Sequence, residues 1–171
     1  MAGGRPVPDD FPPGGTRVSN DFLINARPPT DRVRLGQWTL ERFAELRVLR
    51  GSLHQVLVEQ PLPEGGMLGT VPEKMAIVAT ELAANAMAHT RPPTTVRLSR
   101  TEWAFILEVV DNSPWVVPRF AERGPVTSAG LGLRLARQLS LDMGWHLLGP
   151  AKCVWAQIAI PTVPHGTVDA D

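Results

Sequence analysis

A helical pattern in the middle of the chain carries polar side chains beside an apolar stripe. In ATELAANAMAHT (79–90), Glu81, Asn85 and His89 recur every four residues among small and apolar residues. At about 100° per residue, a stripe built on Met75 passes through His89, whereas Glu81 and Asn85 lie together on its flank. This predicts two polar side chains stacked one turn apart, where a helix packed on a sheet borders a cleft. The alternative is that both are ordinary flank residues and that His89 is a capping or partly buried histidine.

A second polar residue ends an apolar strand pattern. Asp111 closes WAFILEVVD (103–111) and is followed by Asn112, Ser113 and Pro114. An Asp in this position is commonly a turn former, because its carboxylate bonds to the backbone two residues further on. A buried carboxylate could instead accept a hydrogen bond from an exocyclic amine in an apolar pocket, and it would need such a partner. The strand alone leaves both interpretations open.

The third piece is SAGLGLRLARQLS (128–140), in which Gly130 and Gly132 open an amphipathic helix. Glycines at a helix start let the backbone approach a ligand, and the free N–H groups with the helix dipole favour phosphate oxygens. Glycines also commonly mark helix entry. The chain has no Walker GxxxxGK[ST] motif and no dinucleotide GxGxxG after a first strand. A nucleotide would therefore have to bind through a different kind of motif.

The elements that position these residues can be read from periodicity. A strand over 32–40 precedes a helix over 41–59, and a second helix runs from Thr70, an N-cap candidate followed by Pro72, to about His89. A hairpin of strands 94–100 and 103–111 follows, then a long polar loop, a helix from near Gly130, and two strands around 145–149 and 153–160. This order predicts an α+β fold, a two-layer sandwich with a mixed, mostly antiparallel sheet and helices on one face.

Composition limits the class of protein. The chain has 171 residues, and 17 basic and 17 acidic side chains cancel, so no overall charge points to nucleic acid or an anionic membrane. A single cysteine, Cys153, excludes an intrachain disulfide, and no apolar run can span a bilayer. We expect a soluble cytoplasmic protein with a flexible Pro/Gly-rich arm over 1–30, one domain over 31–161 and a tail over 162–171.

In order and spacing, the three pieces resemble the Bergerat (GHKL) ATP-binding fold, the superfamily of gyrase, histidine kinases and MutL. The resemblance rests on E-L-x-x-N-A (81–86), Asp111 at a strand end, and G-x-G-L (130–133) opening a helix, and it covers roughly residues 40–161. The small size, the lack of a helix with a phospho-acceptor His, and the ending KCVWAQIAIP (152–161) look most like the single-domain anti-sigma-factor serine/threonine kinases.

The resemblance implies a role for each residue. Asn85 would coordinate a Mg²⁺ ion that bridges the ATP phosphates, and Glu81 would act as general base toward the attacking hydroxyl. Asp111 would recognise the adenine amino group. Further nucleotide contacts would come from Ser113, Ser128, Gly130, Gly132, the amides of Leu131 and Leu133, and a lid arginine, Arg119 or Arg123.

The function that the resemblance implies is ATP-dependent transfer of a phosphoryl group to a Ser or Thr. The acceptor would be an anti-anti-sigma (STAS-type) partner, and the protein would regulate transcription by sequestering a sigma factor. The resemblance also implies a possible homodimer. A detached sensor-kinase module acting on a histidine is a third interpretation, but no phospho-acceptor helix is visible for it.

Two departures favour the alternative of a non-catalytic or weakly ATP-binding regulator with the same fold. Asp111-Asn112-Ser113-Pro114-Trp115 lacks both glycines of the D-x-G-x-G pattern, and bulky Trp115 stands near the expected nucleotide. In addition, members of the superfamily tend to carry a Thr on a late strand, where it supports the adenine-binding Asp. The matching position here looks like Cys153, which is a weak hydrogen-bond partner.

Overall fold

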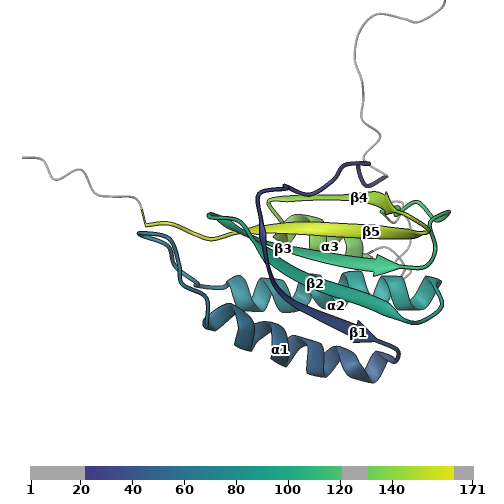
Figure 1. Ribbon diagram of the computed structural model, residues 1–171, viewed down its shortest axis with the longest axis horizontal. Coiled ribbons are helices and arrows are strands. Elements are labelled where there is room, and N and C mark those ends of the chain that lie inside the picture. The colour runs from purple at the N-terminus through teal and green to yellow at the C-terminus, as the bar shows by residue number, and fades with distance from the viewer. Residues whose placement is uncertain (1–21, 121–130, 164–171) are drawn as a thin grey trace, which may run out of the picture.

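The protein forms a five-stranded antiparallel sheet with helices on one face (Figure 1). The structure, a computed structural model, describes residues 22–120 and 131–163. The strands occur in the order β1-β2-β3-β5-β4 and each pairs antiparallel with its neighbours. Their bounds are β1 (Val33–Leu40), β2 (Thr94–Arg100), β3 (Ala104–Asp111), β4 (Asp142–Leu148) and β5 (Ala151–Ala159). The predicted α+β class is thereby confirmed, and the strands pair only in the antiparallel sense.

The helices cover the sheet from one side (Figure 1). A short 3₁₀ turn, η1 (Phe43–Glu45), leads into α1 (Leu46–Val58), and α2 (Val71–His89) and α3 (Leu131–Leu139) complete the layer. The central helix α2 contacts α1, α3, β2, β3 and β5. The core lies between the helices and the sheet. It is formed in part by leucines at three- and four-residue spacing on α1 and by alternate residues of β3.

The predicted apolar stripe of α2 is largely confirmed. Met75, Val78, Ala79, Leu82 and Ala86 are all buried. His89 was expected on this stripe, and that prediction is wrong, because His89 is exposed and lines the pocket at the end of α2. Thr70 occupies the N-cap position, but its side chain makes no capping hydrogen bond.

The segment before β1 is docked on the sheet. Asn25 forms a parallel bridge with Trp145 on edge strand β4, and the indoles of Trp145 and Trp155 donate to the carbonyls of Leu23 and Ala26 at 3.1 and 2.7 Å. The chain then crosses the outer face of the sheet toward β1 (Figure 1). The flexible arm expected over 1–30 is therefore held in its described part, 22–30, because buried Leu23 and these hydrogen bonds fix it.

None of the helices in the described ranges is long and apolar enough to cross a membrane.

Candidate functional site

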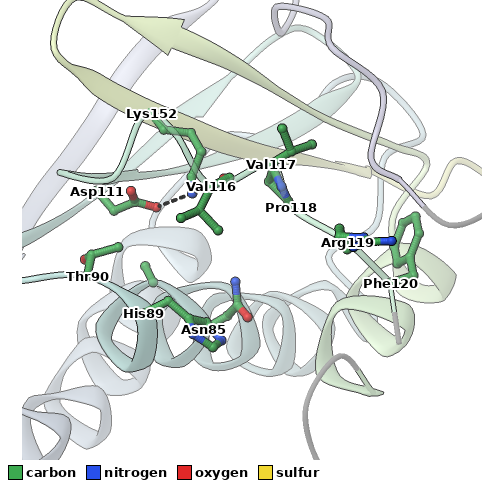
Figure 2. Close-up of a pocket in the computed structure, with 11 residues that line it drawn as sticks. Asn85, His89, Thr90, Asp111, Val116, Val117, Pro118, Arg119, Phe120 and Lys152 are labelled. Carbon is green, nitrogen blue, oxygen red and sulfur yellow. Dashed lines mark hydrogen bonds and ion pairs between the residues drawn. The ribbon is translucent and has the colours of Figure 1, made fainter. Parts of the chain in front are cut away.

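A pocket of about 280 Å³ opens beside the C-terminal end of α2 (Figure 2). It lies between that helix, the end of β3 and the segment that follows β3. Its lining consists of Asn85, Ala86, His89, Thr90, Asp111, Val116, Val117, Pro118, Arg119, Phe120 and Lys152. Two residues that the sequence singled out separately, Asn85 and Asp111, thus share one cavity.

Asp111 is buried at the end of β3 and both its carboxylate oxygens are engaged. Oδ1 accepts a hydrogen bond from the Ser113 amide at 2.8 Å, which is the turn geometry expected of an Asp before Asn-Ser-Pro. Oδ2 lies 3.4 Å from the Lys152 ammonium. Burial raises the pKa of the Asp111 carboxyl, while the Ser113 amide and the Lys152 charge oppose that rise. The interpretation of Asp111 as a turn former is therefore confirmed, and its buried carboxylate has the Lys152 ammonium as a partner.

Lys152 is the site residue that sequence reasoning missed. It stands directly opposite Asp111 in the β3–β5 ladder, is buried, and donates a hydrogen bond to the Val116 carbonyl at 2.7 Å. Its side chain reaches from β5 down to the pocket wall beside Asp111 (Figure 2). The available signal was that it is the one charged residue in an otherwise apolar strand pattern, AKCVWAQIA.

Cys153 does not support Asp111, and the prediction that placed it there is wrong. It pairs with Val110 and lies on the opposite face of the sheet. The reason is the register of the β3–β5 ladder, which places Lys152, and not Cys153, opposite Asp111. Side chains alternate between the two faces of a strand, so adjacent residues cannot both face the pocket. Burial and the nearby Glu108 carboxylate raise the pKa of the Cys153 thiol to about 12.

Glu81 and Asn85 occupy the same flank of α2 but meet different neighbours. Asn85 lines the pocket and lies on α2 beside His89 (Figure 2). Glu81, one turn earlier, packs against the first turn of α3. A Cβ added at Gly132 would overlap Glu81 Oε2, so a side chain at this position would force the Glu81 carboxylate to move. A carboxylate beside the start of a helix is favoured by the helix dipole. The packing of α2 against α3 thus joins the first and third sequence pieces.

The other predicted residues are distributed around this arrangement. Leu131 is exposed, whereas Leu133 is buried in the core, so only its backbone is available to a ligand. Arg119 lies on the pocket wall with its guanidinium 4.6 Å from the Phe22 ring centre. Trp115 is 90% exposed and does not line the pocket. Ser128, Gly130 and Arg123 lie outside the described residues.

Two further polar groups belong to the pocket. His89, at the end of α2, is close enough for its charge to lower the pKa of Asp111 slightly. The Thr90 hydroxyl is buried and has no hydrogen-bond partner within the described ranges. The pocket therefore combines a carboxylate, an ammonium, an amide and an unsatisfied hydroxyl with apolar walls formed by Ala86, Val116 and Val117. Such a lining can orient a small flat molecule with a polar edge.

Comparison of the chain with protein-family models and with curated proteins finds no match to either.

Proposed function

We propose that this chain is a Bergerat-type ATP-binding regulator of the anti-sigma-factor class. In this proposal it transfers the γ-phosphoryl group of ATP to a Ser or Thr of an anti-anti-sigma (STAS-type) partner and sequesters a sigma factor. The observation that carries the proposal is the meeting of three distant sequence pieces. Asn85 and Asp111 line one pocket, and Glu81, one turn from Asn85, touches Gly132 at the start of α3.

The pocket suits the base of a nucleotide better than a whole nucleotide. Its volume of about 280 Å³ lies near the lower limit of small-molecule sites, which run from roughly 300 to 1,000 Å³. A carboxylate offers about four acceptor positions. Asp111 can thus accept from an adenine amino group while it keeps Ser113 and Lys152 as partners. Asn85, at the helix side of the pocket, supplies an amide oxygen of the kind that Mg²⁺ accepts.

The catalytic part of the proposal assigns each residue a task. Asn85 binds the Mg²⁺ ion that neutralises phosphate charge. Glu81 accepts the proton of the attacking hydroxyl, and its contact with Gly132 holds the carboxylate beside the start of α3. The amides of the first turn of α3 bind phosphate oxygens.

Calorimetric titration with Mg²⁺ and ATP tests the binding step. We expect saturable binding of ATP and not of GTP, which has a carbonyl in place of the 6-amino group of adenine that Asp111 accepts from. Binding of ATP should be lost in Asp111→Asn. Glu102→Gln, an exposed acidic residue between β2 and β3, is the matched control and should bind like the wild type. Equal binding of ATP by Asp111→Asn and wild type contradicts the proposed site.

Transfer of radiolabel from ATP to purified STAS-type proteins tests the kinase step. Glu81→Gln should keep ATP affinity and reduce transfer by about 10²- to 10⁴-fold, the usual contribution of a general base. Undiminished transfer in Glu81→Gln contradicts the role given to this residue.

The ion pair of Lys152 with Asp111 favours a second candidate, a protein-binding regulator with weak ATP affinity. Here the ammonium takes the place of the adenine amino group at Asp111, with Val116 as its second partner. This candidate predicts much weaker ATP binding by the wild type than the first candidate does, and a gain of binding in Lys152→Met protein that circular dichroism shows to be folded. The same calorimetric titration therefore separates the two candidates.

A further inference from the structure

The outer face of the sheet, opposite the helices, carries a polar cluster that the proposed function does not use. Its members are Glu108 on β3, His146 on β4 and Cys153 on β5. Cys153 is paired with His146 in one ladder and with Val110, two residues from Glu108, in the other. One carboxylate oxygen, one imidazole nitrogen and the thiol sulfur lie within 4.8 Å of one another. Three adjacent strands thus present three different metal-binding groups at one point.

The cluster is shielded from water. Glu108, His146 and Cys153 are 3%, 8% and 0% exposed. The segment that crosses this face contributes to the cover, since Trp155 donates to the Ala26 carbonyl and Arg32 reaches Glu108 (Figure 1). Ionisable groups in such a place need partners, because unpaired polar atoms away from water are costly.

His146 is oriented as a metal ligand. Its Nδ1 lies 3.0 Å from the Leu147 carbonyl oxygen. A carbonyl only accepts hydrogen bonds, so Nδ1 carries a proton, and in the neutral ring Nε2 then presents a lone pair. That Nε2 is buried and has no hydrogen-bond partner among the residues that the structure describes. Metal-bound histidines show this arrangement, in which the second ring nitrogen donates to a carbonyl or carboxylate.

Glu108 is held by one oxygen and free at the other. Oε1 accepts from Arg32 at 3.1 Å and lies 3.8 Å from Cys153 Sγ. Oε2 is buried with no hydrogen-bond partner in the described part of the chain. A plain Arg32–Glu108 ion pair explains Oε1, but it leaves both Oε2 and the Nε2 of His146 unexplained. One cation between these two atoms and Sγ satisfies both.

We propose that Glu108 Oε2, His146 Nε2 and Cys153 Sγ bind a Zn²⁺ ion, with one water as the fourth ligand. Thiolate with imidazole is a ligand set that selects zinc over Mg²⁺ and Ca²⁺, which take oxygen ligands. Ligand bonds to zinc are about 2.0–2.3 Å long, so the three side chains must draw closer together around a bound ion. Binding releases the Cys153 thiol proton to solvent.

The bound ion has a structural consequence. It links β3, β4 and β5, and through the Arg32–Glu108 ion pair it also fastens the crossing segment 26–32. Because a metal that binds only the folded state adds its binding free energy to stability, zinc should raise the melting temperature of the whole chain.

Metal titration of the full chain tests the site. Chelator-treated, tag-free protein is titrated with Zn²⁺ in competition with a chromophoric chelator. We expect one zinc per chain and an affinity at least about tenfold weaker in Cys153→Ser and in His146→Gln. His54→Gln, an exposed histidine on α1, should bind like the wild type. Glu102→Gln, an exposed acidic residue between β2 and β3, should also bind normally.

Cobalt substitution gives a readout that does not depend on variants folding. Co²⁺ bound at this site produces a thiolate-to-cobalt charge-transfer band, since Cys153 is the single cysteine of the chain. Absence of that band in the wild type, or zinc affinity unchanged in folded Cys153→Ser, overturns the proposal. Circular dichroism confirms folding of each variant, and the rise in melting temperature with Zn²⁺ should be confined to proteins with the intact cluster.

Discussion

At the scale of single residues, the pocket depends on one buried charge pair. Asp111 and Lys152 face each other across β3 and β5, and each has a second, backbone partner in the loop after β3. Because both charges are buried, removing one side chain leaves the other as an unpaired buried charge, which destabilises the fold. Removing both leaves no unpaired charge and costs much less stability.

A double-mutant cycle measures this dependence. Lys152→Met alone should lower the free energy of unfolding by about 3–5 kcal/mol, because Asp111 is left as an unpaired buried charge. Asp111→Asn combined with Lys152→Met should cost much less than the sum of the single changes, since Asn keeps an oxygen for the Ser113 amide. Urea unfolding of the four proteins gives the coupling, and additive losses contradict a mutually dependent pair.

The raised pKa of Asp111 also predicts the direction of a pH effect. Between the ordinary value of 3.8 and the higher folded pKa, the folded state holds more protons than the unfolded state. The contribution of Asp111 to stability is therefore present below pH 3.8 and is lost as the pH rises through the folded pKa. The free energy of unfolding of the wild type, relative to the Asp111→Asn/Lys152→Met protein, should fall over that range. A pH-independent difference contradicts this.

At the scale of elements, α2 and α3 pack closely where α3 carries a glycine, Gly132, which has no side chain. Gly132 lets the first turn of α3 approach Glu81 of α2, whereas Gly51, at an exposed position of α1, has no atom within 4 Å of an added Cβ. Both glycines are helical, so alanine should be favoured at both by propensity alone. The difference between the stability effects of alanine at Gly51 and at Gly132 therefore reports on the packing of α2 against α3.

Alanine substitution tests this packing. Gly51→Ala should raise the free energy of unfolding by about 0.5–1 kcal/mol. Gly132→Ala should raise the free energy of unfolding by less than this, because its Cβ displaces the Glu81 carboxylate. In a Glu81→Ala background, Gly132→Ala should give the full increase. Chemical unfolding of the five proteins gives the coupling between Gly132 and Glu81. Equal gains at both glycines in the wild-type background exclude the contact.

At the scale of the whole molecule, the sheet separates two polar sites. The pocket with Asp111 and Lys152 lies on the helix side, and the cluster of Glu108, His146 and Cys153 lies on the outer side. The segment 22–32 makes the second site possible, since it adds a parallel bridge to β4 and then crosses the outer face (Figure 1).

Two neighbouring residues test the docking of that segment. Leu23 is 4% exposed and packs in the core, whereas Ile24 is 47% exposed. Leu23→Ala should lower the free energy of unfolding by about 2–5 kcal/mol, because it opens a cavity under the segment. Ile24→Ala keeps the same backbone hydrogen bond to Trp145 and should change stability by less than about 0.5 kcal/mol. Similar effects from both variants, measured by thermal or urea unfolding, contradict docking through Leu23.

Local patterns predicted most of the elements correctly. The helix of 71–89 follows from its three- and four-residue apolar spacing and from Pro92-Pro93 after its end, and the hairpin of β2 and β3 from alternation. The bond from Asp111 to the Ser113 amide was also readable, because it spans two residues. Such features depend on neighbours in the chain, so they are encoded at short range.

The sequence by itself therefore determined the order of strands and helices, the apolar face of α2 and the turn at Asp111. Tertiary structure alone decided that Lys152 and not Cys153 faces Asp111, that Glu81 meets Gly132, and that 22–32 covers the cluster of Glu108, His146 and Cys153. The physical reason is strand register. With side chains alternating every residue, a shift of one position moves each group to the opposite face, and register is set by contacts between residues far apart in the chain.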